Sequence, residues 1–278
     1  MKKISRRSFM AAAAVSVAAL AMTACGGSAS SAASSVASSA ASSEAVSSAA
    51  AADLTTVEAG KLTMATNATF PPYEMTTDSG EIEGIDVDTA KAIAEKLGLE
   101  LQIDDMDFDA ALLSVQQGKA DIVMAGVTVT DERKAVMDFS DSYATGIQSI
   151  IVPNDSDIAS PDDLADKKIG TQRGTTGYIY CSDDFGEDSV VAYDNGLTAV
   201  QALNNGQVDA VVIDNAPAME YVAANPGLKV LDTSYAEEDY AIGMAKGSAL
   251  EDAVNKALEE LKADGTLQAI VDKYINAN

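Results

Sequence analysis

The chain has 278 residues, with 18 lysines and arginines against 43 aspartates and glutamates, and it contains no histidine. The formal net charge of −25 argues against nucleic-acid binding, because neutralising phosphates requires surfaces rich in lysine and arginine. With two cysteines and no histidine, the chain also lacks the usual zinc ligand sets, so we expect neither a metal site nor a cofactor.

The first 24 residues resemble a bacterial export signal. Four basic residues precede an apolar run over residues 9–24, and these 16 residues are too few to span a bilayer comfortably. The run ends in Met22-Thr23-Ala24-Cys25, which resembles a lipobox and predicts cleavage before Cys25 and lipidation of that cysteine. A plain secretory signal with a chance cysteine is the alternative, and residues 5–10 also resemble a twin-arginine export motif.

Residues 25–56 are rich in serine and alanine and contain no aromatic residue. Such a segment buries too little apolar surface to offset its ordering entropy, so we interpret it as a flexible tether, although its alanines leave a helical alternative. Its mean reach would be about 30 Å. We therefore expect an extracytoplasmic protein that is anchored to the membrane by its lipid, on the cell surface or in the periplasm. Removing the signal takes the formal net charge from −25 to −29 and leaves Cys181 without a partner for an internal disulfide.

From Lys61 onward, strand and helix patterns alternate. Residues 62–65 and 99–103 read as strands, and a helix with one apolar face over residues 86–97 lies between them. A short helix after Phe108 leads to a third apolar strand at residues 122–124. This rhythm predicts a mostly parallel sheet with helices on its faces.

A second α/β unit follows the first. Its predicted strands and helices cover residues 148–152, 168–171, 196–204, 208–213 and 215–224. The chain then has room for two crossings between the units, which we place near residues 143–147 and 238–242. Two amphipathic helices end the chain, and Ser248-Ala249-Leu250-Glu251 reads as a capping box for the first of them.

Polar residues gather where the predicted strands end. In open α/β sheets, ligands lie beyond the carboxyl ends of the strands. Four loops leave such ends, namely residues 67–73, 125–130 and 172–177 and the position of Asp214. Two of them come from each unit, which is the arrangement that a cleft closing on its ligand requires.

Two charged residues of these regions suggest specific chemistry. The planar guanidinium of Arg133 is suited to hold a carboxylate, and Thr128 can add a hydroxyl and a backbone N–H. A solvated surface arginine is the alternative. Asp214 ends an apolar strand, so its carboxylate must meet a cation or water, or cap a helix that begins near Pro217.

The stretch over residues 121–146 carries a more specific pattern. It shows a strand, an A-G-x-T turn, T-x-x-R and a D-F-S-x-x-Y run, and it strongly resembles the core signature of the amino-acid-binding solute receptors of ABC importers (family 3 extracellular solute-binding proteins). The matching residues are Ala125, Gly126, Thr128, Thr130, Arg133, Asp138, Phe139, Ser140 and Tyr143. Residues 65–75 and the G-x-D-V-D run at residues 84–88 also match, so the resemblance covers residues 57–278.

The resemblance implies a two-lobed α/β fold of the periplasmic-binding-protein-like type II. Residues 57–145 and 241–278 would form the first lobe and residues 146–240 the second, each with a mostly parallel sheet flanked by helices, and two hinge crossings would join them. The implied function is that of a monomeric receptor, not an enzyme. It would capture an L-amino acid, of polar character, by closing its cleft and would deliver it to the transmembrane subunits of an ABC permease.

The same resemblance assigns roles to residues. Arg133, with the N–H groups of Thr128 and Thr176, would hold the α-carboxylate, and Asp214, helped by the Thr128 hydroxyl, would accept the α-ammonium. Phe70 and Phe108 would surround the ligand side chain. The full predicted site comprises Asn67, Phe70, Phe108, Ala125, Gly126, Thr128, Arg133, Gln172, Thr176 and Asp214. Asn67 stands where some relatives carry an acid, which leaves the specificity open.

Two other classes of protein use the same architecture. One is a dehydratase of the prephenate or arogenate type. The absence of histidine and of nucleophile, metalloprotease and phosphate-loop motifs argues against it. The other is an amino-acid sensor that signals without transport. Fold alone does not separate these classes from a transport receptor.

Overall fold

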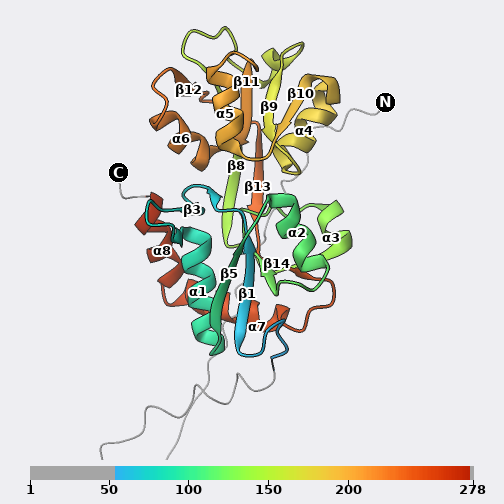
Figure 1. Ribbon diagram of the computed structural model, residues 1–278, viewed down its shortest axis with the longest axis vertical. Coiled ribbons are helices and arrows are strands. Elements are labelled where there is room, and N and C mark those ends of the chain that lie inside the picture. The colour runs from blue at the N-terminus through green and yellow to red at the C-terminus, as the bar shows by residue number, and fades with distance from the viewer. Residues whose placement is uncertain (1–53, 276–278) are drawn as a thin grey trace, which may run out of the picture. The chain divides into compact units, whose positions relative to one another are not determined.

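The structure is a computed structural model that describes residues 54–275 (Figure 1). All of these residues belong to one compact unit. The predicted export signal, Cys25 and the tether up to residue 53 lie outside the described residues. Among the helices of residues 54–275, none is both long enough and apolar enough to cross a membrane.

The first of two large sheets has the strand order β5-β1-β6-β14-β7. Its central strand β1 runs parallel to β5 and β6, whereas β14 runs antiparallel to β6 and β7. The strands are β1 (Lys61–Thr66), β5 (Glu100–Asp105), β6 (Ile122–Val123), β7 (Met137–Phe139) and β14 (Gly243–Ala245). A small antiparallel sheet of β2 (Thr69–Phe70), β3 (Glu74–Thr76) and β4 (Ile82–Glu83) follows β1.

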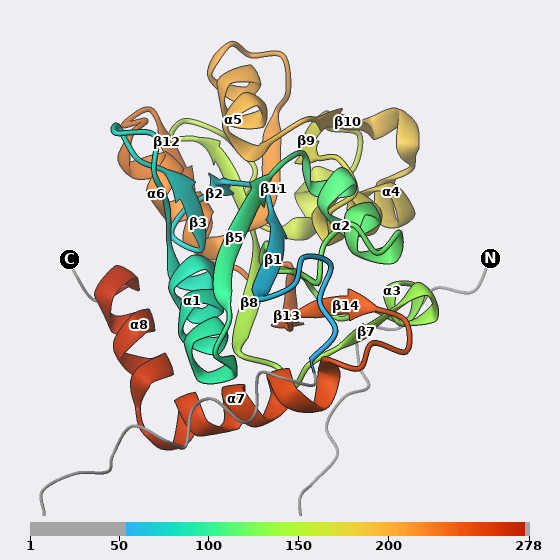
Figure 2. The ribbon, with the colours of Figure 1, turned by 60° about the horizontal axis from the view of Figure 1, so that its bottom comes forward.

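Five helices accompany the first sheet and make the first lobe with it. They are α1 (Ile85–Leu97), α2 (Phe108–Gln116), α3 (Asp131–Val136), α7 (Glu251–Ala263) and α8 (Thr266–Ile275). The two C-terminal helices pack against α1 (Figure 2), so the end of the chain returns to the lobe in which it began. The predicted capping box is wrong, because α7 begins at Glu251 and the Ser248 hydroxyl instead accepts the Leu250 N–H at 3.2 Å.

The second large sheet has the strand order β10-β9-β11-β8-β12, and β13 also pairs with β8. The strands are β8 (Ala144–Pro153), β9 (Ile169–Gln172), β10 (Val190–Tyr193), β11 (Ala210–Asp214), β12 (Leu228–Val230) and β13 (Ala236–Tyr240). The helices of this second lobe are α4 (Thr176–Phe185), α5 (Gly196–Asn204) and α6 (Asn215–Ala223), with short 3-10 turns η1 (Pro161–Leu164) and η2 (Glu187–Ser189).

The two-lobed α/β architecture is as predicted, but both large sheets are mixed rather than mostly parallel. Parallel pairing is confined to β5-β1-β6 and to β10-β9-β11. The other strands pair antiparallel, including β8 with β11, β12 and β13. The alternation of strands and helices in the sequence predicts only the parallel strands of each sheet. A strand that carries the chain from one lobe to the other enters its sheet antiparallel to those strands.

Two paired strands run between the lobes (Figure 1). β8 and β13 pair antiparallel from Ala144 opposite Tyr240 to Gln148 opposite Ala236. Below them the Tyr143 N–H donates to the carbonyl of Tyr240 at 2.9 Å. The two predicted crossings therefore form one hydrogen-bonded ribbon. The predicted lobe boundaries at 145/146 and 240/241 fall along this ribbon and stay a prediction.

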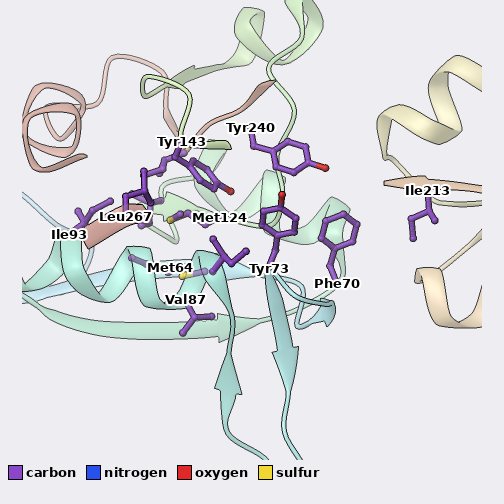
Figure 3. Close-up of a cluster of buried hydrophobic side chains, with 14 of the residues drawn as sticks. Met64, Phe70, Tyr73, Val87, Ile93, Met124, Tyr143, Ile213, Tyr240 and Leu267 are labelled. Atoms are coloured by element: carbon purple, nitrogen blue, oxygen red, sulfur yellow. The ribbon is translucent and has the colours of Figure 1, made fainter. Parts of the chain in front are cut away.

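An aromatic cluster packs against the ribbon (Figure 3). The rings of Tyr73 and Tyr240 meet edge to face with their centroids 5.3 Å apart, and Phe70 lies 5.9 Å from Tyr73. Tyr240 is fully buried. It has room only because residue 146 of β8 is glycine, since a Cβ there would lie 2.3 Å from the ring atom Cζ.

We expect Gly146→Ala to destabilise the fold by about 1–3 kcal/mol, because a buried ring that is packed on all sides cannot move aside. Urea denaturation measures this change. Gly227→Ala is the matched control, since nothing lies within 4 Å of its Cβ position, and its stability should stay within about 0.5 kcal/mol of wild type. Equal stabilities of the two variants would contradict this account of the ribbon.

Candidate functional site

A cavity lies where β1, β6, β9 and β11 end, between the two lobes. It is lined by Asn67, Phe70, Glu74, Phe108, Ala125, Gly126, Thr128, Arg133, Gln172, Thr175, Thr176 and Asp214. All ten residues of the predicted site are among them, and Glu74 and Thr175 are additional. The structure thus brings the ten together, while their roles toward a ligand stay a prediction.

Arg133 lies in the first turns of α3, and its side chain is buried, with 8% of the residue exposed. Nη1 donates to the carbonyl of Thr128 at 2.8 Å, and Nη2 donates to the carbonyl of Gly174, on the other lobe, at 3.1 Å. The guanidinium stacks over Phe108 at 5.3 Å from the ring centroid. Burial lowers the pKa of Arg133. Within residues 54–275 no carboxylate forms an ion pair with Arg133, so its charge is available to an anion.

Two threonines from opposite lobes meet beside this guanidinium. The hydroxyls of Thr128 and Thr176 are 3.5 Å apart. Thr176 opens α4, whose N-cap is Thr175 with a hydroxyl that accepts the Tyr178 N–H at 3.4 Å. The first backbone N–H groups of a helix have no acceptor within it and attract negative charge. Arg133 and the start of α4 therefore form an anion-binding corner.

Asp214 lies across the cavity at the end of β11 and is 7% exposed. It occupies the N-cap position of α6, but its side chain does not cap the helix. Its Oδ1 instead accepts the hydroxyl of Tyr240 from the interlobe ribbon. Burial raises the pKa of Asp214 to about 7, and the nearby charge of Glu238 adds to the effect. A cation placed here would favour the ionised form.

Glu238 is a buried carboxylate that the sequence analysis missed. It is 6% exposed, and its Oε2 accepts Gln148 Nε2 at 2.9 Å and Thr128 Oγ1 at 3.2 Å. Its Oε1 has no partner among the described residues. Period-two alternation could have identified it, because Glu238 stands two residues before buried Tyr240 on one face of β13.

Rings and amides form another part of the cavity wall. Phe70 and Phe108 are both buried, and Gln172 Nε2 donates to Asn67 Oδ1 at 2.9 Å across the lobes. Gly126 fits beside Phe70 only without a side chain, since it has φ 56° and its Cβ would lie 2.7 Å from the ring. Two aromatic rings therefore border this part of the cavity.

Glu74 lines the same cavity and was also missed, although it stands one residue beyond the predicted loop. It is 0% exposed, and neither carboxylate oxygen has a hydrogen-bond donor in the described part of the chain. Burial, followed by the neighbouring carboxyl of Asp86, raises its pKa well above the usual range. An unpartnered carboxylate in such a place favours a cationic or hydrogen-bond-donating ligand.

The raised pKa of Asp214 predicts a pH-dependent stability. Its folded pKa exceeds the unfolded value of about 3.9. The contribution of Asp214 to the free energy of unfolding should therefore be largest below about pH 4 and be lost as the pH rises through about 7, by about 1.4 kcal/mol per pH unit. Asp214→Asn keeps an acceptor for Tyr240 and should show a shallower fall in urea denaturation without added amino acids. Exposed Asp78→Asn is the control, and parallel profiles for all three proteins would refute the prediction.

The chain is similar in sequence to proteins of known families. A model of the bacterial extracellular solute-binding proteins, family 3, matches residues 62–277. A probable histidine-binding protein of Neisseria gonorrhoeae is 34% identical over 272 residues, which cover 95% of this chain and 94% of the relative. The L-cystine-binding protein TcyJ of Escherichia coli K12 is 33% identical over 225 residues, with 80% and 85% covered.

A solved structure of an ancestral arginine-binding protein bound to arginine has 43% sequence identity and a TM-score of 0.74, covering 78% of this chain and 98% of that one. This match and the family model confirm the predicted two-lobed type II fold. The relatives are binding proteins and not enzymes, so the dehydratase alternative has no support. The chain belongs to the bacterial extracellular solute-binding proteins of family 3.

Proposed function

We propose that this protein is the receptor of an ABC importer and that it captures an L-amino acid in the cavity between its lobes. One observation carries the proposal. A buried guanidinium without a carboxylate partner, Arg133, faces a buried carboxylate, Asp214, across the same cavity. These charges complement the α-carboxylate and α-ammonium that every free amino acid presents. Thr128 and Thr176 would add hydrogen bonds to the same groups.

Other residues of the cavity support a ligand with a polar, cationic side chain. Glu74 has two unpartnered oxygens there, and Phe70 and Phe108 supply ring faces on which a guanidinium or ammonium stacks favourably. Relatives are named for histidine and arginine binding, which agrees with this charge. Asn67 and Gln172, already hydrogen-bonded to each other, would contact the side chain from the remaining wall.

Binding would act by shifting the protein toward its closed form. Arg133 and Gln172 already join the lobes, and the Tyr221 hydroxyl donates to the carbonyl of Thr69 across the same opening at 2.6 Å. A ligand that contacts Arg133 on one lobe and Asp214 on the other would add its own bonds only when the lobes are together. The closed form would then be what the permease recognises.

We also propose that the mature protein is a monomeric lipoprotein held at the outer face of the cytoplasmic membrane or a comparable extracytoplasmic surface. The lipobox-like Met22–Cys25 and the serine- and alanine-rich tether support this. An anchor with a reach of about 30 Å would keep the binding protein within range of its permease.

Calorimetric titration of the purified protein with the common L-amino acids tests the receptor role. We expect binding of one or a few of them, and a loss of about 2–5 kcal/mol of binding free energy in Arg133→Ala, because the ligand carboxylate is then left buried without a partner. Arg173→Ala is the matched control, as this neighbouring arginine is exposed. A loss below tenfold in Arg133→Ala would refute the role of Arg133, and no binding of any amino acid would refute the proposal.

Labelling cells with a fatty-acid analogue tests the anchor. The full chain should take up the label and fractionate with membranes, whereas Cys25→Ala should do neither. Cys181→Ala is the control that should keep the label, since this cysteine is buried in the second lobe. Equal labelling of Cys25→Ala would exclude the lipobox interpretation.

A further inference from the structure

A second buried carboxyl lies behind Glu74. Asp86, in the first turn of α1, is 0% exposed. Its Oδ2 accepts the N–H of Gly126, a residue of the cavity wall, at 3.0 Å, and its Oδ1 has no partner in the described part of the chain. Asp86 belongs to the G-x-D-V-D run of the sequence, to which the proposed function gives no role.

The backbone holds these two carboxyls side by side. The N–H groups of Ile85 and Asp86 donate to the carbonyls of Pro72 and Tyr73 at 3.0 and 2.9 Å. The close approach requires glycine at position 84, where a Cβ would lie 2.1 Å from the Tyr73 carbonyl oxygen. The segment before Glu74 is thus fastened to the start of α1, which places the two carboxyls within reach of each other.

Among residues 54–275, the titratable groups that act on the pair are all acids. Neither carboxyl forms an ion pair with a lysine or arginine of residues 54–275. The titratable groups that face Glu74 from other elements are Asp86 of α1, Asp105 of β5, Asp214 of β11, Tyr221 of α6 and Tyr143 beside the interlobe ribbon, together with the adjacent Tyr73. Two neighbouring carboxylates cannot both be ionised in such surroundings without a large cost.

One proton shared between Glu74 and Asp86 removes the cost of two neighbouring ionised carboxylates. If Glu74 is protonated, its O–H supplies a donor to Asp86, whose Oδ1 otherwise has no partner among the described residues. Burial raises the pKa of Asp86 to about 6 and that of Glu74 well above its usual range. The pair titrates as a unit, and the proton belongs to both residues.

We propose that Glu74 and Asp86 hold one proton between them and that a ligand with a cationic side chain displaces it, so that Asp86 sets the specificity of the cavity through Glu74. This rests on the proposed amino-acid binding. The proton passes to solvent buffer, and the ligand cation takes its place against the Glu74 carboxylate. A neutral side chain leaves the proton in position between the two carboxyls.

The consequence is a pH-dependent choice of ligand. At pH values where the pair holds its shared proton, each unit rise in pH should lower the dissociation constant of a cationic ligand by one further factor of ten compared with a neutral isostere, because one more proton is released. L-Arginine and L-citrulline are such a pair. They share length and shape and differ in side-chain charge. The comparison also cancels any proton that Asp214 releases to the buffer when the α-ammonium binds, since both ligands carry this group.

The experiment is calorimetric titration of the full protein at pH 6 in buffers of different ionisation enthalpy, which counts released protons. Wild type should release about one proton more with arginine than with citrulline. Asp86→Asn keeps an acceptor for Gly126, removes the neighbouring negative charge and gives Glu74 an N–H donor, so the pKa of Glu74 falls although burial still raises it. This variant should release measurably less of the extra proton and bind arginine at least as tightly as wild type. Exposed Asp155→Asn should behave as wild type.

Glu74→Gln provides a second measurement if Asp86→Asn does not fold. It should lose more than tenfold in arginine affinity, keep citrulline binding and show no difference in proton release. If citrulline does not bind, the number of protons released on arginine binding is compared between wild type and either variant. Arginine binding with no extra proton, or with the same proton in Asp86→Asn, would overturn this inference while leaving the receptor role intact. Failure of every amino acid to bind would instead overturn the receptor role.

Discussion

Among the described residues, the hydrogen-bond acceptors of the buried Arg133 guanidinium are two backbone carbonyls, one from each lobe. Desolvating a guanidinium is costly unless a counter-charge compensates it, and no described carboxylate pairs with it. The neighbouring parts of the cavity lie around this guanidinium, which lacks a counter-charge among the described residues. The start of α4 adds N–H groups on one side, and the aromatic ring of Phe108 shields the guanidinium from water. A carboxylate entering from solvent completes the arrangement.

The carboxylates of the site are held by residues of β13, one of the two strands that connect the lobes. Glu238 and Tyr240 point from β13 toward the cavity, where Tyr240 donates to Asp214 and Glu238 accepts from Thr128 and Gln148. The strand that carries the chain between lobes therefore also orders the carboxylates that would meet an α-ammonium. Of these bonds, the one between Glu238 and Thr128 joins the two lobes, so a rotation of the lobes would alter it. Ligand recognition and lobe movement thus share the same side chains.

Local patterns predicted the helices with clear apolar faces, such as α1 and α7, and the strands whose ends line the cavity. Short-range motifs also located Arg133 and Asp214. The pairing of β8 with β13 could not be predicted from the sequence, because the direction in which two distant strands pair depends on the path of the chain between them and not on their own residues. Glu238 and Glu74 were missed for a related reason. Acidic residues in a predicted crossing or loop are ordinarily solvated, and only tertiary packing buries them.

The hydrogen bond from Tyr221 to the Thr69 carbonyl joins the lobes without involving any residue that lines the cavity. Bonds of this kind contribute equally to the closed form whichever solute is inside. Altering such a contact scales the apparent affinity for all solutes by one common factor and leaves their ratios untouched. The overall affinity of this protein and its selectivity among solutes can therefore change independently. A substitution at Tyr221 could alter the solute concentration at which the protein binds without altering which solute it prefers.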